Sequence, residues 1–328
     1  MKYDTIVVGG GMAGLTTTAY LAKAGNKVLL VEKQEDLGGL VSSFPYKGYV
    51  FDGGIRAMEN SGIIFPMLKQ LGIDIDFVRS VVSVGYEDEI IKVTDKSSLK
   101  TYQKLLESKF PNNIDDIDNI IKEIAKIMKY MDILYGIDNP LFLDFKRNKK
   151  YLLTTIFPWM FKYLFTIGKV EKRKAPYDDY LATFTDNQAL IDMIGQHFFK
   201  KTPAFFALSY FSLYLEYNYP LGGTGMLVDK MAAFIENQKG EIKTNTMITK
   251  VDVDKQLVYD QDGNEYEYDH LVWASDKRAL YQFLDKENIK NDTLKSTVAL
   301  KVKQLKHKRG GDSIQSVYLG VDLLVRYF

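Results

Sequence analysis

The sequence predicts an α/β protein in which a Rossmann-like dinucleotide-binding domain carries an inserted domain of mixed helices and strands. Three observations support this fold class: a βαβ pattern with a glycine fingerprint in residues 1–32, a helix-rich middle with little glycine, and strand patterns that return after residue 216. We expect residues 1–75 and 216–290 to form a discontinuous nucleotide domain. Residues 76–215 and 291–328 are expected to form a substrate or lid domain, and 328 residues suffice for two domains.

The opening of the chain carries the most specific signal. A strand pattern at residues 3–8 leads into Gly9-Gly10-Gly11-Met12-Ala13-Gly14, then a helical pattern, then a second strand pattern at residues 27–31 that ends in Glu32. In such a fingerprint Gly9 makes the tight turn, Gly11 lets the backbone approach a pyrophosphate and Gly14 lets the helix lie close to the strand. The helix start attracts phosphate, and Glu32 accepts hydrogen bonds from a ribose hydroxyl. A glycine-rich turn without a ligand is the alternative.

The composition excludes several classes of function. The net charge of +1 gives no global field for nucleic acid, and the absence of cysteine excludes disulfides, thiolate metal sites and thiol redox chemistry. The histidines at positions 197, 270 and 307 lie far apart in the sequence, so we expect no metal site. No signal peptide precedes the first strand pattern, which makes a cytoplasmic protein the default expectation.

Residues 76–215 read as largely helical. Isoleucine and methionine recur at helical spacing between Ile114 and Met131, with aspartates in the first turn and lysines toward the end. This stripe predicts an amphipathic helix that faces a core. Further helical patterns cover residues 151–167, 177–199 and 203–217.

Strand patterns return near the end of the sequence. The segment Pro220-Leu221-Gly222-Gly223-Thr224-Gly225-Met226 precedes a helical pattern, and Asp262-Gly263 between two short apolar runs predicts a hairpin turn. Ser275 and Asp276 are candidate caps of a following helix. Residues 296–328 alternate between apolar and polar side chains and are expected to form strands.

These blocks together resemble the flavin amine oxidase and phytoene desaturase superfamily of FAD-dependent oxidoreductases. The first block is the fingerprint up to Glu32, the second runs through Gly38-Gly39, Ser42 and residues 48–53, and the third runs from Pro220 to Leu227 and continues to Val251. The resemblance covers most of residues 1–75 and 216–276. The helical middle matches only in position and in its apolar, aromatic character.

The resemblance implies FAD as the cofactor and assigns no catalytic residue. It implies that Gly38-Gly39 packs along the pyrophosphate, that the stretch near Gly53-Gly54 approaches the flavin, and that the backbone near Ile248 meets the adenine. Leu40 stands where many members have Arg or Lys, so one cationic phosphate contact is in doubt. The candidate cofactor-binding residues are Gly9, Gly11, Met12, Ala13, Gly14, Glu32, Lys33, Gly38, Gly39, Leu40, Gly53, Gly54 and Ile248.

The resemblance also implies a further C-terminal segment that closes over the flavin, and residues 291–328 do not resemble it. We therefore expect a C-terminally incomplete chain, from a truncated or split gene, with a compact variant as the alternative. Such a chain is expected to hold flavin weakly and to turn substrate over poorly.

The function implied is desaturation, isomerisation or saturation of a C–C bond in an isoprenoid, by hydride transfer to or from the flavin. Aromatic residues between Phe198 and Tyr214 suit an apolar substrate, although a helical core explains them equally. A flavin amine oxidase or protoporphyrinogen oxidase and a catalytically inactive fragment remain alternatives. An NAD-dependent dehydrogenase would explain residues 9–32 but neither Gly38-Gly39 nor the later glycine block.

Residues 152–167 form an apolar helical pattern with basic flanks and an internal Trp159. Pro158 and Lys162 interrupt the pattern, so a membrane span is not expected. A buried lid helix and a helix lying in a membrane interface both fit this composition. Peripheral membrane contact is therefore one expectation for this chain, and its oligomeric state is open.

Overall fold

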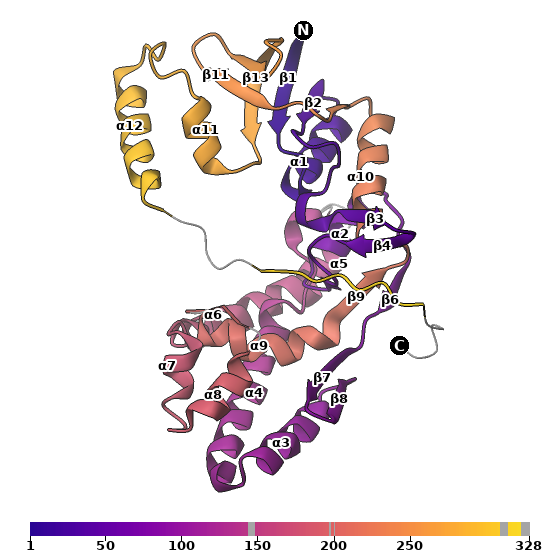
Figure 1. Cartoon of the computed structure of the whole chain (residues 1–328), viewed down its shortest axis with the longest axis vertical. Helices are drawn as coiled ribbons and strands as arrows, with labels where there is room; N and C mark the ends of the chain where they lie inside the picture. Colours follow the sequence, from indigo (N-terminus) through magenta and orange to yellow (C-terminus); the bar gives the residue numbers. More distant parts are fainter. Residues whose placement is uncertain (144–147, 197, 200, 309–313, 323–328) are drawn as a thin grey trace. The chain divides into compact units, whose positions relative to one another are not determined.

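The computed structural model describes residues 1–143, 148–196, 198–199, 201–308 and 314–322 (Figure 1). The chain divides into two compact units. The first unit comprises Met1–Arg56, Ile73–Asp76 and Pro220–Phe328, and the second comprises Ala57–Gly72 and Phe77–Tyr219. This division differs from the expected boundaries at several places, and residues 216–219 belong to the second unit. Residues 57–72 lie in the second unit, and the C-terminal segment after residue 290 lies in the first.

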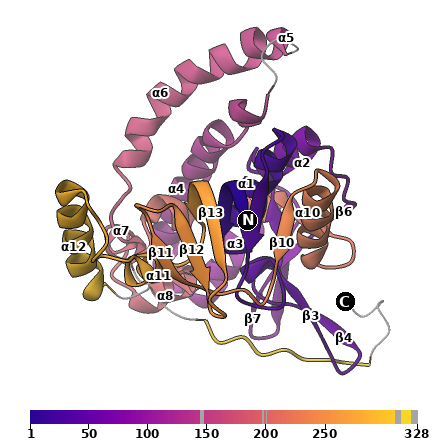
Figure 2. The same ribbon diagram turned by 90° about the horizontal axis from the view of Figure 1, so that it is seen from above.

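The first unit is built on a six-stranded sheet. Its order is β10 (Glu241–Lys243), β2 (Val28–Val31), β1 (Lys2–Val8), β13 (Glu265–Trp273), β12 (Leu257–Asp260) and β11 (Ile248–Asp252). The first four strands are parallel, and β12 and β11 extend the sheet in antiparallel fashion. Figure 2 shows β11, β12 and β13 side by side. The predicted Rossmann-like sheet and the predicted hairpin at Asp262-Gly263 are confirmed.

Helices α1 (Met12–Lys23) and α10 (Gly225–Asn237) pack against each other beside this sheet. Their buried residues are small or aliphatic, which lets the two helices approach closely: Leu15 and Ala19 on α1, Leu227 and Met231 on α10. Gly240 follows α10, and a Cβ atom there would lie 2.6 Å from the Ile235 side chain. The return into β10 therefore requires glycine at this position.

The C-terminal part of the first unit corrects one expectation. The segment expected to form strands from residue 296 begins instead as helix α12 (Asp292–Lys306), which follows α11 (Lys277–Phe283). Residues 314–322 have no regular secondary structure, and residues 309–313 and 323–328 lie outside the described residues. Asn291 caps α12 by accepting a hydrogen bond from the Leu294 amide at 2.9 Å. Only Val298 is buried on this helix, so its apolar residues did not mark a strand face.

The second unit is mainly helical, as predicted. Its helices are α2 (Ile64–Leu71), α3 (Ser98–Lys109), α4 (Ile114–Leu134), α5 (Lys149–Tyr151), α6 (Phe157–Glu171), α7 (Tyr177–Leu181), α8 (Gln188–Gly195) and α9 (Ala204–Leu213). The helical pattern expected over residues 177–199 thus divides into α7 and α8. Short strands complete the unit: β5 (Met58–Glu59), β9 (Tyr217–Pro220) and β6 (Phe77–Arg79) form one sheet, and β7 (Val82–Tyr86) and β8 (Glu89–Val93) form a hairpin.

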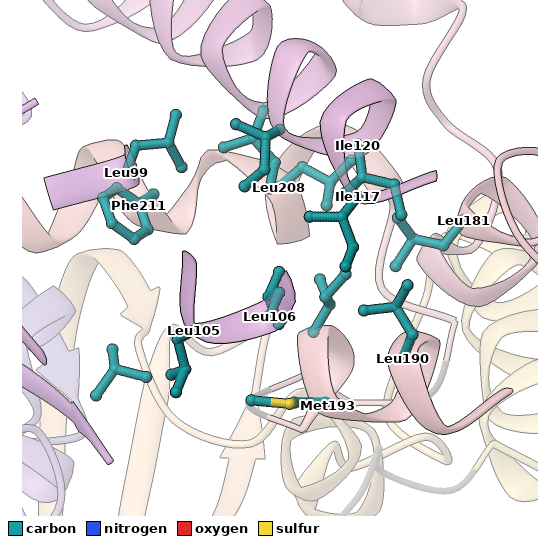
Figure 3. Close-up of a cluster of buried hydrophobic side chains, with 14 of the residues drawn as sticks. Leu99, Leu105, Leu106, Ile117, Ile120, Leu181, Leu190, Met193, Leu208 and Phe211 are labelled. Carbon is teal, nitrogen blue, oxygen red and sulfur yellow. The ribbon is translucent and has the colours of Figure 1, made fainter. Parts of the chain in front are cut away.

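One aliphatic cluster forms the core of the second unit (Figure 3). The predicted stripe on α4 supplies much of it, with Ile117, Ile120 and Ile127 fully buried, whereas Ile114 at the helix start is half exposed. Leu106 from α3, Leu181 from α7 and Leu190 from α8 contribute to the same cluster. Among the helices of the described ranges, none combines the length and hydropathy that a membrane span needs.

Candidate functional site

The glycine turn between β1 and α1 has the close approaches that the fingerprint requires. Gly9 adopts a φ of 112° and donates its N–H to Val31 O at 2.8 Å. A Cβ atom on Gly9 would lie 2.9 Å from Ala274 O, and one on Gly14 would lie 1.8 Å from Gly9 O. Glycine at these two positions therefore allows the helix to start directly against the strand end.

Gly11 differs from its two neighbours in the fingerprint. Its φ of −72° suits any residue, and a Cβ atom there would meet nothing within 4 Å. A side chain at position 11 would thus enter open space at the start of α1. Within the described residues, the amides of Met12 and Ala13 have no hydrogen-bond acceptor, and no side chain caps this helix. Free amide donors and the positive end of the helix dipole are groups that attract an anion.

The Gly38-Gly39 loop lies directly against the glycine turn. Gly38 donates its N–H to Gly10 O at 2.8 Å, and Gly11 and Gly38 form an isolated parallel bridge. Both loop glycines have positive φ values, of 100° and 58°. A Cβ atom on Gly38 would lie 2.5 Å from the Val228 side chain. The glycine turn and the Gly38-Gly39 loop therefore form one continuous backbone surface.

The Glu32 carboxylate is held by backbone amides on both of its oxygens. Gly10 donates to Oε2 at 2.6 Å, and Gln34 donates to Oε1 at 2.9 Å. Because a carboxylate has about four lone-pair positions, each oxygen retains an acceptor site for a further hydroxyl group. Thr246 donates its N–H to Glu32 O at 2.8 Å, which fixes residues 246–248 beside this carboxylate.

A hollow of about 260 Å³ opens where these segments meet, at the carboxyl ends of β1, β2 and β13. Four candidate cofactor-binding residues line it together: Gly9, Glu32, Lys33 and Ile248. Residues that were not predicted complete the wall: Val8, Val31, Thr246, Met247, Trp273, Ser275, Asp276, Ala279 and Phe283. A ligand-binding crevice outside the carboxyl ends of the strands is the usual arrangement in open α/β sheets.

Hydrogen bonds and a ring contact connect the residues of the wall at positions 273–283. Trp273 donates its indole N–H to Asp276 O at 2.9 Å and lies against Phe283, with ring centroids 6.2 Å apart. Asp276 caps α11 by accepting from the Arg278 amide at 2.8 Å, which confirms the predicted cap. The hydrogen bonds from Arg278 also lower the pKa of Asp276. The sequence pattern of this region did not predict the hydrogen bond between Trp273 and Asp276.

Leu40, Gly53 and Gly54 lie on a loop and a hairpin outside this hollow. Leu40 is 74% exposed on the turn η1 (Gly39–Val41), and a Cβ atom on Gly54 would lie 2.5 Å from Leu40 O. Gly53 follows the hairpin of β3 (Ser43–Tyr46) and β4 (Tyr49–Asp52) and donates to Ser42 O at 2.7 Å. Tyr318 donates to Gly53 O at 3.1 Å. These contacts bring Leu40 and the Gly53-Gly54 pair together.

The second unit contains a larger hollow of about 390 Å³ with an acidic wall. Glu59, Asp132, Asp138 and Glu216 line it, together with Tyr135 and Tyr151, and its lining includes no Lys or Arg. Burial raises the pKa of Glu59. Asp132 also forms an ion pair with Lys96 at 2.5 Å. The remaining carboxylates make this hollow suited to a cationic group.

Comparison with known proteins identifies relatives of this chain. Among curated proteins, an inactive all-trans-retinol 13,14-reductase of Danio rerio is 24% identical over 77% of this chain and 43% of its own length. A chloroplastic prolycopene isomerase of Daucus carota is 26% identical over 77% of this chain and 42% of its own length. The chain therefore spans less than half the length of these relatives.

A solved structure from Pyrococcus furiosus superimposes with a TM-score of 0.60 over 94% of this chain and 66% of its own, at 18% identity, and so shows the shared fold. Residues 12–306 match the family described as flavin containing amine oxidoreductase. That match covers Gly38-Gly39, the block from Pro220 to Leu227 and the helical middle, and it begins inside the glycine fingerprint at Met12. The chain is thus a member of the flavin containing amine oxidoreductase family.

Proposed function

We propose that this chain is the FAD-binding part of an oxidoreductase that acts on an apolar, isoprenoid-like substrate. The observation that carries the proposal is the hollow beside the glycine turn, where Gly9, Glu32, Lys33 and Ile248 meet. Because the chain spans less than half the length of its curated relatives, the activity and the substrate of the whole protein are both part of the proposal.

The residues around the glycine turn fit a dinucleotide. The open space at Gly11 and the free amides at the start of α1 suit a pyrophosphate. Glu32 suits the adenosine ribose, and the backbone and side chain near Ile248 suit the adenine. A bound flavin supplies the acceptor or donor of a hydride. The role of the chain itself is to hold the dinucleotide in place and to exclude water from its adenosine half.

The relatives support an apolar substrate, since one is named for all-trans-retinol and the other for prolycopene. The aromatic residues predicted to suit such a substrate form a chain of edge contacts in the second unit. Phe198 and Tyr210 lie 4.9 Å apart between ring centroids, and Tyr210 and Tyr214 lie 5.6 Å apart. This partly buried aromatic cluster lies in the unit expected to hold the substrate.

A second candidate is a flavin amine oxidase-like activity on a cationic amine. The observation that favours it is the acidic hollow of the second unit, which Glu59, Asp138 and Glu216 line without any lysine or arginine. An ammonium group is stabilised by such carboxylates, whereas an isoprenoid would leave them desolvated.

The cofactor part of the proposal is tested by visible absorption of the purified chain with added FAD. Gly11→Val places a branched side chain in the open space at the start of α1, so we expect flavin binding to fall by at least about tenfold while the fold survives. Gly168→Val is the matched control, since a Cβ atom at Gly168 also meets nothing within 4 Å. Stoichiometric FAD on the Gly11→Val variant would show that the pyrophosphate lies elsewhere.

The substrate part is tested by turnover assays on the FAD-loaded chain with a retinoid, a carotenoid precursor and an aliphatic diamine. Turnover of the isoprenoids supports the first candidate. Turnover of the diamine, with a thermal shift that Glu59→Gln abolishes and Glu171→Gln does not, supports the second. Absence of turnover with all three substrates contradicts activity of this chain alone.

A further inference from the structure

The helices α5 and α6, labelled in Figure 2, and the π-helical turn η4 (Leu152–Ile156) between them form one segment. Its side chains lie on two different faces. One face packs on α4: Trp159 donates its indole N–H to Ile133 O at 2.5 Å, and Thr166 and Val170 are buried. Positions 159, 163, 166 and 170 repeat at helical spacing, so the most buried side chains of α6 lie on a single stripe. The opposite face has no such partner within the described residues.

The opposite face is apolar and exposed. Leu153, Phe157, Met160, Phe161, Leu164 and Phe165 point away from the unit, with Leu164 60% exposed and Phe165 76% exposed. Steps of three and four residues place these side chains on one continuous surface. A helix that is apolar on both faces belongs in a buried position or against a membrane. Single exposed apolar residues are common, but six adjacent large ones mark an interaction surface.

Most charged side chains around this face are basic. Residues 148–174 carry seven basic side chains and one acidic side chain, Glu171. Arg173 pairs with buried Glu123, and Lys174 pairs with Glu171. The other five lysines meet no carboxylate of the described residues: Lys149, Lys150, Lys162, Lys169 and Lys172. The sequence also places Lys146 and Arg147 before this segment, and both lie outside the described residues.

We propose that residues 149–174 form a docking surface for anionic phospholipid membranes, with α6 lying flat in the interface. The exposed apolar side chains would enter the acyl boundary, and the surrounding lysines would contact the lipid phosphates. The segment does not span the bilayer, because no described helix reaches the necessary length and hydropathy. This proposal goes beyond the redox function and does not depend on the identity of the substrate.

Charge complementarity selects this partner. Two copies of the chain that met through this face would bring their lysines together, and like charges oppose such a dimer. An anionic bilayer instead satisfies the apolar face and the lysines at once. The same argument predicts that binding weakens with ionic strength, because exposed charges are screened over about 10 Å at 0.1 M salt.

The test is co-sedimentation of the full chain with vesicles of phosphatidylcholine alone and of phosphatidylcholine with phosphatidylserine, at low and high salt. We expect binding to the anionic vesicles that high salt weakens. The double variant Leu164→Glu/Phe165→Glu should lose binding by at least about tenfold. Ile90→Glu is the matched control, because Ile90 on β8 is similarly exposed, at 71%. Lys162→Gln/Lys172→Gln should weaken binding more than Lys100→Gln/Lys104→Gln on α3.

A second measurement covers the case in which the double variant does not fold. Because the chain has no cysteine, Phe165→Cys accepts a polarity-sensitive fluorophore at one site only. Its emission should shift to the blue with anionic vesicles, whereas a label on Ile90→Cys should not respond. The proposal is overturned if the native chain does not bind anionic vesicles at low salt. It is also overturned if the labels respond alike, or if Phe165→Glu only converts a dimer into a monomer.

Discussion

Asp52 Oδ1 accepts two hydrogen bonds from Thr224, one from the amide and one from the hydroxyl, both at 2.9 Å. Thr224 precedes α10 and is fully buried, so the hairpin of β3 and β4 supplies the cap that this helix lacks in its own sequence. Ser43 completes the junction, since it donates to Asp52 Oδ1 and accepts from the Gly225 amide, again at 2.9 Å. The second and third glycine blocks are therefore joined by one carboxylate.

Asp52→Ala should destabilise the first unit, because it removes the acceptor of the buried Thr224 amide and leaves the Thr224 hydroxyl with the longer bond to Val41 O at 3.2 Å. We expect a loss of about 2–4 kcal/mol in the free energy of unfolding. Asp52→Asn should cost less, since its amide oxygen can still accept one of these bonds. Denaturant unfolding of the two variants measures the difference.

Asp229→Asn on the exposed side of α10 is the control for helix composition, and we expect it to leave stability unchanged. Equal stability of Asp52→Ala and the native chain would contradict the role of Asp52 as the cap of α10.

The local parts of this junction were predictable from sequence, and its central contact was not. The glycine fingerprint and the Asp262-Gly263 hairpin depend on neighbouring residues, so their spacing alone indicates their conformations. Asp52 and Thr224 are separated by 172 positions, and the sequence of either block carries no sign of the other. The same holds for Trp273 and Asp276 in the wall of the hollow, which depend on where β13 ends.

The prediction of strands from residue 296 onward was wrong for a different reason. Val298, Leu300 and Val302 alternate like a strand, yet Val298 and Val302 are also one helical turn apart. Leu300 is 56% exposed on α12, so the alternation did not mark a buried face. Asn291 and Asp292 were the available signal, because a capping residue followed by an acidic first turn favours a helix start.

Gly14→Ala should cost more stability than Gly11→Ala. Alanine normally favours a helix over glycine by about 1 kcal/mol. At Gly14 the new Cβ atom would lie 1.8 Å from Gly9 O, so we expect a net loss of about 1–3 kcal/mol instead. At Gly11 we expect a loss of less than about 1 kcal/mol. Thermal unfolding of the flavin-free chain compares the two, and equal losses would contradict the close approach at Gly14.

The second unit should lose stability in acid through Glu123. Arg173 donates its Nε–H to Glu123 Oε1 at 2.5 Å, and its Nη2 forms an ion pair with the same oxygen at 2.5 Å. Tyr180 donates its hydroxyl to Glu123 Oε1 at 2.9 Å. Burial opposes ionisation of Glu123, but the hydrogen bonds from Arg173 and Tyr180 outweigh it and lower its pKa. A lowered pKa stabilises the fold above the unfolded value of about 4.3, and this contribution is lost as the pH falls through the folded value.

Glu123→Gln tests this pH dependence. At neutral pH it should destabilise the chain by about 3 kcal/mol, because Arg173 remains buried without its anion. Its stability should then change less than that of the native chain between about pH 5 and about pH 3. Glu171→Gln removes an exposed ion pair with Lys174 and should follow the native curve. Parallel curves for Glu123→Gln and the native chain would contradict the assignment.

Glu32→Gln should separate the adenosine end of the cofactor from its flavin end. The carboxylate accepts from Gly10 at 2.6 Å and from Gln34 at 2.9 Å while it lines the hollow assigned to the ribose. Glutamine keeps the size but has one acceptor oxygen, so one backbone amide or the ribose hydroxyl loses its partner. We expect the affinity for FAD to fall by about 10–100-fold, the range of one hydrogen bond to a charged group.

Affinity for riboflavin 5′-phosphate, which lacks adenosine, should stay unchanged in Glu32→Gln. The control variant Glu35→Gln, on the exposed loop, should match the native chain for both ligands. Fluorescence titration of each flavin, alongside unfolding of the flavin-free chain, distinguishes a ribose contact from a purely structural one. Equal losses of affinity for both flavins would show that Glu32 supports the turn and does not bind the ribose.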